Sequence, residues 1–164
     1  FYITHPQSRG SVRLRSSSPF DPPLIRVNYL ENESDMQLMV EGLKISRQLA
    51  HSNVFNEFRG EEIAPRAEVY SDKAIRDYIR QTCDTAWHPV GTCKMGIDRM
   101  AVVDPQLKVR GIEGLRVVDA SIMPTITTGN TNAPAIMIGE KGAGIIKAAK
   151  YSFKQHGSDK KYIW

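Results

Sequence analysis

One histidine combines a ring that can accept a proton with a sequence that fixes its backbone. His88 lies between Trp87 and Pro89, and the proline holds His88 in an extended conformation and removes one backbone donor. Gly91 and Thr92 follow, and the glycine lets the backbone turn closely against a neighbouring group. An imidazole accepts a proton near neutral pH, as a general base must. The alternative is a structural histidine that is hydrogen-bonded beside a proline turn.

Two further segments carry polar groups that could bind an anion, a dipole or a cofactor hydroxyl. Asn130, Thr131 and Asn132 form an amide- and hydroxyl-rich loop that opens into a predicted helix, where N–H groups and the positive end of the helix dipole converge. Capping accounts for Asn132, and turn propensity is the alternative explanation for Asn130. Asp119, followed by Ala120, ends a predicted strand. Its carboxylate either binds a cofactor hydroxyl or only starts a turn.

The first half of the chain predicts two short strands and two helices. Polar and apolar residues alternate over 8–15, a pattern typical of a half-buried strand, and 24–27 predicts a second extended segment. An amphipathic helix of about 15 residues is predicted after Ser34, which forms a capping-box pattern with Gln37. A second, shorter amphipathic helix is predicted to begin at Ser71.

The second half of the chain predicts a strand, a polar loop and a long helix. Residues 115–119 form the strand, and residues 127–132 form the loop. The helix spans 133–150, with Asn132 as its N-cap and Pro134 in its first turn. A missing backbone N–H costs nothing in that turn. The helix therefore begins directly at the polar loop.

Composition limits the class of protein. The chain has 164 residues, of which 41% are hydrophobic, and a formal net charge of +4, which indicates one globular domain rather than a disordered or fibrous chain. The longest apolar run, Ala133 to Ile138, is far shorter than the ~20 residues of a membrane span. The chain opens without an initiator methionine or a signal-peptide pattern, so we expect it to be a piece of a longer protein.

Basic residues and cysteines argue against a nucleic-acid-binding or zinc-binding protein. Arg13 and Arg15 alternate with apolar residues, as on the solvent side of a strand, and the final lysines follow a helical pattern. No nucleic-acid partner is therefore predicted. Cys83 and Cys93 form no CxxC motif, and no metal site is predicted. The two cysteines are predicted to be buried thiols, or a disulfide if the parent protein is secreted.

Taken together, the order and spacing of several segments resemble the C-terminal signature of the glucose-methanol-choline (GMC) flavin oxidoreductases. The resemblance extends to about residue 150 and is most similar to the branch that contains the insect glucose dehydrogenases. The matching segments are 5–12, 21–29, 87–92, 94–96, 103–105, 114–124 and 129–141.

The resemblance implies a role for each of the chemical groups. Family members oxidise a CH–OH group of a small alcohol or sugar by removing the hydroxyl proton and passing a hydride to N5 of the flavin. His88 matches the family's catalytic histidine, and Asn130 matches the second active-site position, which would hold the substrate oxygen. The resembled branch alone points to an extracellular location. The positions implied to lie near the FAD cofactor are Trp87, Asp119, Ala120, Thr131 and Asn132.

One departure from the family pattern is large. The fingerprint GxGxxG, which binds the pyrophosphate of FAD after an early strand, is absent from this sequence. Gly139, Gly142 and Gly144 lie inside the last predicted helix, where they indicate close helix packing or a helix weakened by up to ~1 kcal/mol per glycine. We therefore expect that the N-terminal FAD-binding half is missing. The isolated chain would then bind FAD poorly and expose a large apolar interface.

The expected architecture is α+β, with a mainly antiparallel sheet that carries helices. Residues 1–112 would form the substrate-side region with the catalytic histidine, 113–150 a strand, loop and helix that return to the FAD domain, and 151–164 a polar tail. Two other functions remain open at this point. The chain could be a truncated, non-catalytic binding module derived from the family, or a cysteine hydrolase built on Cys93 and His88.

Overall fold

The computed structural model describes the backbone of residues 1–157 and the side chains of residues 1–150. The chain divides into two compact units, Phe1–Trp87 and His88–Trp164. The expected boundary near residue 112 concerns the domains of a larger enzyme and stays a prediction. The α+β expectation is confirmed in its coarse form, because helices accompany a small antiparallel sheet.

A short hairpin opens the first unit. β1 (Ser11–Arg13) pairs antiparallel with β2 (Leu24–Arg26), so both predicted extended segments are confirmed. Val12 lies opposite Ile25, and the two side chains are 51% and 65% exposed. The expected half-buried face is therefore not covered within the described residues.

The first helix of this unit begins earlier than the sequence pattern predicts. α1 (Glu33–Ala50) has Asn32 as its N-cap, whose side-chain oxygen accepts the N–H of Ser34 at 3.0 Å. The predicted start at Ser34 was wrong because Asn and Ser are equally good caps and the sequence offers both. α2 (Asp72–Thr82) is capped by Ser71, as predicted.

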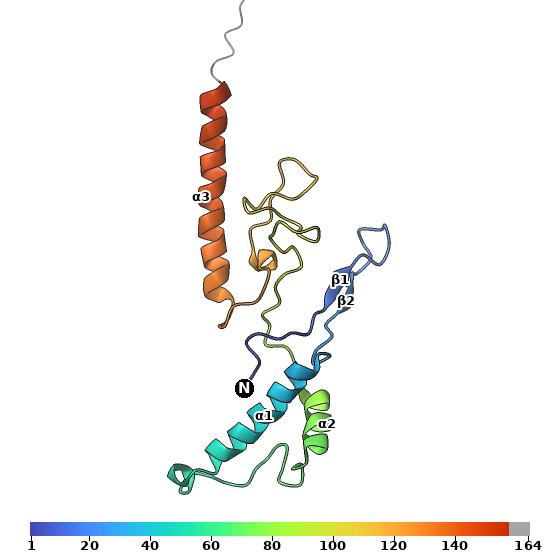
Figure 1. Ribbon diagram of the computed structural model, residues 1–164, viewed down its shortest axis with the longest axis vertical. Helices are drawn as coiled ribbons and strands as arrows, with labels where there is room; N and C mark the ends of the chain where they lie inside the picture. The colour runs from blue at the N-terminus through green and yellow to red at the C-terminus, as the bar shows by residue number, and fades with distance from the viewer. Residues whose placement is uncertain (158–164) are drawn as a thin grey trace, which may run out of the picture. The chain divides into compact units, whose positions relative to one another are not determined.

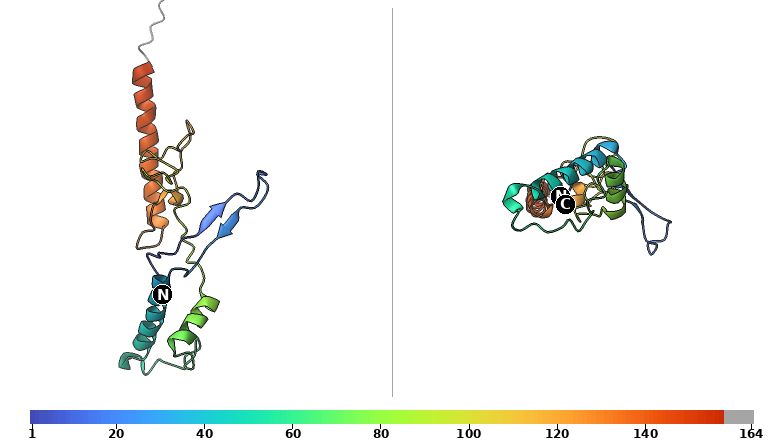
Figure 2. Two further views of the ribbon diagram at one scale, coloured as in Figure 1. Left: turned by 45° about the vertical axis from the view of Figure 1, so that its right-hand side comes forward. Right: turned by 90° about the horizontal axis from the view of Figure 1, so that it is seen from below.

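The core of the first unit lies between these two helices. α1 and α2 lie side by side in both views (Figures 1 and 2). Positions separated by three or four residues turn toward the partner helix, as the amphipathic pattern requires. The buried side chains are Met36, Val40 and Leu43 from α1, and Ile75 and Ile79 from α2.

A buried carboxylate ties the N-terminal segment to α1. Asp35 is 1% exposed and accepts hydrogen bonds from the backbone N–H of Gln7, at 2.8 and 3.0 Å, and from the N–H and hydroxyl of Ser8, at 2.7 and 2.6 Å. Burial alone would raise the pKa of Asp35, but these hydrogen bonds and the charge of Arg9 outweigh it and hold the pKa below its usual range. The ionised form of Asp35 therefore stabilises this fold.

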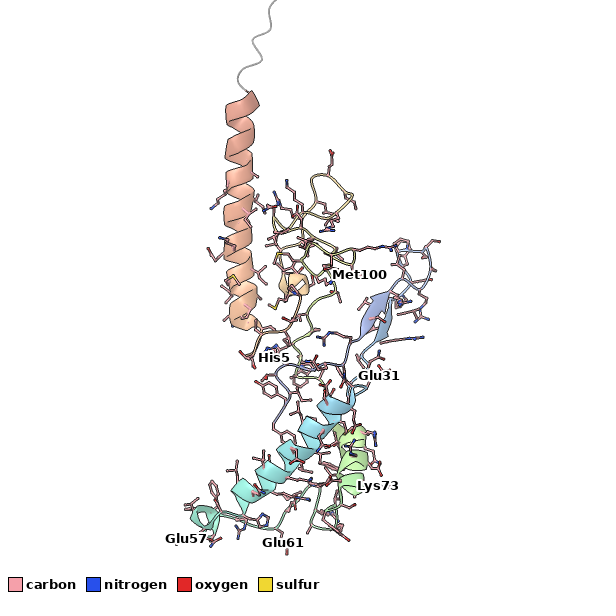
Figure 3. The ribbon with its side chains drawn as sticks, viewed as in Figure 1. His5, Glu31, Glu57, Glu61, Lys73 and Met100 are labelled. Atoms are coloured by element: carbon pink, nitrogen blue, oxygen red, sulfur yellow. The ribbon has the colours of Figure 1, made fainter. Side chains whose placement is uncertain are left out.

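The segment between α1 and α2 is pinned by one guanidinium group. After a short turn of 3-10 helix, η1 (Asn53–Phe55), the chain returns toward α2. Figure 3 shows Glu57 beyond the end of α1 and Glu61 on the returning segment. Arg47 donates to a carboxylate oxygen of Glu62 at 2.8 Å and to the backbone carbonyls of Arg66 and Val69 at 2.8 and 2.6 Å. One side chain of α1 thus holds three points of a segment with little regular structure.

The second unit has no continuous sheet within its described residues. The predicted strand over 115–119 was wrong, because only Arg116 pairs, in a single bridge. Gly111 and Gly114 have positive φ values of 79° and 73° and lie in the turn that brings Arg116 beside Lys108. Within residues 115–119, no strand forms beyond that single bridge. The isolated bridges join Met95 to Val103, Val103 to Val109, and Lys108 to Arg116.

A compact apolar cluster supports the second unit. It joins the bridged loops, the short helix η2 (Ala120–Ile122) and the long helix α3 (Asn132–Gly157). α3 continues past the predicted end at residue 150 because no proline interrupts it before Gly157. Residues 158–164 of the predicted polar tail lie outside the described residues. The buried members of the cluster are Val103, Leu107, Ile122, Met123 and Ile138.

Candidate functional site

A hydrogen bond across 43 residues of sequence brings two of the predicted segments together. Nδ1 of His88 lies 2.9 Å from the hydroxyl oxygen of Thr131. The Thr131 side chain is buried, with 9% exposure, and His88 is half-buried. Asn130, an exposed residue, directly precedes Thr131. The histidine and the polar loop, which were singled out separately, therefore belong to one site.

The histidine segment is held in place by backbone hydrogen bonds to η2. The N–H of Cys93 donates to the carbonyl of Ser121 at 3.0 Å, and the N–H of Met95 donates to the carbonyl of Ile122 at 2.7 Å. Gly91 has a φ of +88°, and a Cβ there would lie 3.3 Å from the carbonyl oxygen of Met123. The close turn predicted at this glycine is confirmed, and it leads the chain away from His88 along η2.

Thr131 lies at the start of α3. The carbonyl of Thr131 accepts the N–H of Ala135 at 2.9 Å, so Thr131 is the residue at the helix boundary and Asn132 is the first helical residue. The predicted N-cap at Asn132 was wrong by one position. A threonine at the boundary commonly bonds to the N–H of the second or third helical residue. The third is Pro134, which has no N–H, and the hydroxyl of Thr131 is hydrogen-bonded to His88.

Asp119 is a capping residue of η2 in this structure. Its carboxylate accepts the N–H of Ser121 at 2.8 Å, and the side chain is exposed. Ala120 is the first residue of this short helix, and it packs against the apolar cluster. The turn-forming explanation of Asp119 is therefore sufficient for its position, and cofactor contacts by Asp119 and Ala120 stay predictions.

Trp87 has an unusual backbone for a bulky residue. Its φ is +58°, in the left-handed region that only glycine and a few polar residues visit readily. The hydroxyl of Thr85 accepts the N–H of Trp87 at 2.9 Å and helps to hold this conformation. Trp87 is 78% exposed, and its predicted contact with the cofactor stays a prediction.

The two cysteines do not form a disulfide. Cys83 and Cys93 are free and half-buried, less enclosed than predicted. The hydrolase alternative needs His88 to contact Cys93, and among the described residues the ring of His88 is hydrogen-bonded to Thr131 and not to Cys93. Across residues 1–150, whose side chains the structure describes, no group of three or more His, Cys, Asp or Glu side chains could hold a metal ion. None of the described helices is long and apolar enough to cross a membrane.

Comparison with known proteins identifies the family. A family model described as GMC oxidoreductase matches residues 6–139, most of the chain. The chain belongs to the GMC oxidoreductase family. It corresponds to the C-terminal part of these flavoproteins, as the sequence resemblance implied. Enzymes of this family are FAD-dependent, so the expected cofactor is confirmed at the level of the family.

Relatives of known sequence and structure agree with this assignment. An oxygen-dependent choline dehydrogenase of Escherichia coli is 49% identical over 140 residues, which are 85% of this chain and 25% of that protein. Pyridoxine 4-oxidase from Mesorbium loti is 38% identical with a TM-score of 0.80, covering 86% of this chain and 28% of its own. The formate oxidase of Aspergillus oryzae is 35% identical with a TM-score of 0.83, covering 92% and 26%. This chain therefore spans about a quarter of the length of the relatives it matches.

Proposed function

We propose that this chain supplies the proton-accepting part of an FAD-dependent enzyme that oxidises alcohols. His88 removes the hydroxyl proton of the substrate, and Asn130 binds the substrate oxygen. FAD, when bound, accepts the hydride that leaves the carbon, so that the alcohol becomes a carbonyl compound. An alcohol has a pKa near that of bulk water (~15.7), so it needs a positioned base to lose its proton at neutral pH.

The observation that carries this proposal is the 2.9 Å hydrogen bond between His88 and Thr131. It supports the proposal because it joins the imidazole to the residue that directly follows Asn130 in the loop. It also occupies Nδ1 and leaves Nε2 as the ring atom for the substrate. A general base must lie within about 3 Å of the proton that it removes, so the substrate hydroxyl would lie at Nε2.

The residues at the start of α3 fit the polar edge of a flavin. The N–H groups of Asn132 and Ala133 belong to the first helical turn and therefore have no acceptor within the helix. Both residues are exposed. The N-terminus of a helix carries a partial charge of about +0.5, which favours an electron-rich carbonyl or an anion. We propose that Asn132, with Thr131 behind it, faces the cofactor. The return of this segment to the FAD domain is part of the same proposal.

The relatives support a proposal for the substrate class. The chain is 49% identical to an oxygen-dependent choline dehydrogenase, so we propose a small alcohol, with choline as the first compound to test. The sequence resemblance to the glucose dehydrogenase branch makes glucose the second. An N-terminal FAD-binding half would complete the enzyme, since the chain spans only 25% of that relative.

The test replaces His88 in the full-length enzyme that contains this chain. Flavin reduction is followed by its absorbance without oxygen, after mixing with choline, glucose or pyridoxine. His88→Ala should slow reduction by roughly 10²- to 10⁴-fold while the FAD content stays unchanged. His5→Ala removes an exposed imidazole and serves as the matched control. An unchanged reduction rate in His88→Ala would remove His88 from the chemistry, and no reduction of the unmodified enzyme by any alcohol would favour a non-catalytic binding module.

A further inference from the structure

A neutral imidazole exists in two tautomers, and only one of them can act as the proposed base. If the proton is on Nδ1, Nε2 has a free lone pair and can accept a proton. If the proton is on Nε2, this atom can only donate. The partner of Nδ1 therefore decides what Nε2 can do. In this structure the partner is the hydroxyl of Thr131, which can donate or accept.

The surroundings of the Thr131 hydroxyl favour its hydrogen bond to the histidine. Pro134 removes one of the two N–H groups that could compete for it, and Thr131 is 9% exposed. Among the described residues, its hydroxyl makes its hydrogen bond to His88, and no buried side-chain polar atom is left without a partner. Threonine is β-branched, so few side-chain rotamers are available to it. The backbone of Thr131 is also fixed, since its carbonyl accepts the N–H of Ala135.

We propose that Thr131 is a positioning residue for His88, a role that rests on the proposed function of the histidine. The oxygen of Thr131 accepts the Nδ1–H of the neutral ring and thereby keeps Nε2 unprotonated. When Nε2 takes the substrate proton, Nδ1–H still donates to the same oxygen, so the hydrogen bond persists through proton transfer. Thr131 itself does not touch the reacting atoms.

The geometry separates this role from simple helix capping. A hydroxyl that only capped α3 would bond to a backbone N–H of the first turn, and its loss would affect the helix. Here the bond joins two segments 43 residues apart and ends on a ring nitrogen. Removing the oxygen should therefore change the state of the ring more than the stability of α3.

The experiment measures the tautomer directly in the FAD-loaded, full-length enzyme. The protein is labelled with ¹⁵N-histidine, and two-bond ¹⁵N–¹H spectra at alkaline pH report which ring nitrogen carries the proton. The signal of His88 is identified by its loss in His88→Gln. The variants are Thr131→Val, which keeps the shape but removes the oxygen, and Thr131→Ser, which keeps the hydroxyl. Thr128→Val removes an exposed hydroxyl from the same loop and is the control.

We expect Nδ1–H in the unmodified enzyme, in Thr131→Ser and in the control. Thr131→Val should move the proton wholly or partly to Nε2 and lower kcat for flavin reduction by roughly tenfold or more, with a smaller change in KM. Thr131→Ser should recover most of kcat. An Nε2–H tautomer in the unmodified enzyme, or an unchanged Nδ1–H tautomer in Thr131→Val, would overturn the proposal.

The outcome for Thr131 is distinguishable from the outcome for His88. If His88→Ala keeps its rate of flavin reduction, the histidine is not the base and the functional proposal fails. The tautomer spectra still test the hydrogen bond between His88 and Thr131 in that case, because they do not depend on turnover. If His88→Ala loses its rate and Thr131→Val keeps the Nδ1–H tautomer, only the positioning role fails.

Discussion

Three glycines of α3 should respond to the same substitution with opposite signs. A Cβ at Gly142 would collide with Cγ1 of Val118 and lie 3.3 Å from its Cγ2, whereas a Cβ at Gly139 or Gly144 meets nothing within 4 Å. Gly→Ala gains roughly 0.5–1 kcal/mol in a helix interior. Overpacking costs roughly 1–3 kcal/mol, and valine has little rotamer freedom with which to move away.

The stabilisation that Gly→Ala gives through helix propensity is the same at all three positions, so it cancels when the variants are compared. Gly139→Ala and Gly144→Ala should stabilise α3, and Gly142→Ala should be less stable than either by the overpacking cost of roughly 1–3 kcal/mol. Amide hydrogen exchange along α3 gives the local free energy of opening for each variant. The packing argument fails if Gly142→Ala exchanges as slowly as the two matched variants.

Two further predictions concern the first unit. The pKa of Asp35 is lowered in the folded state, so the ionised carboxylate adds to the free energy of unfolding. This contribution is complete above the unfolded pKa of about 3.9 and is lost as the pH falls through the folded pKa. Urea titrations between neutral and acidic pH should show the loss, and Asp35→Asn should abolish this part of the pH dependence. An equal slope in both proteins would contradict it. Met36→Ala should cost about 2–5 kcal/mol because Met36 is 1% exposed. Leu38→Ala, at a position 57% exposed, should stay within about 0.5 kcal/mol in the same urea titration, and similar losses for both would contradict the assigned core.

Local patterns in the sequence were sufficient for the helices and for the two extended segments that become β1 and β2, but not for the pairing of these strands. The apolar spacing of α1 and α2 and the cap at Ser71 act within a few residues, so they can be inferred without knowledge of the fold. The strand expected over 115–119 depended on a partner strand far away in the sequence. Valine-rich composition predicts a strand, but only a single bridge forms there because strand pairing is decided by tertiary context.

The site was predictable in its parts but not in its connection. His88 and the loop from Asn130 to Asn132 stand out by residue type, whereas the bond between His88 and Thr131 joins positions 43 residues apart. A partial signal is Pro134, which removes one of the two backbone N–H groups that a capping threonine commonly uses. The N–H of Ala133 remains, so the sequence does not fix which partner the hydroxyl takes.

The anchored imidazole has an entropic consequence for any reaction at this site. A freely rotating side chain loses up to ~2 kcal/mol of conformational entropy when it is ordered. The hydrogen bond to Thr131 orders His88 before a ligand binds, so the entropy of this side chain is lost on folding and not on binding. The site is preorganised in this respect. Each 1.4 kcal/mol by which the activation free energy falls corresponds to about a tenfold gain in rate.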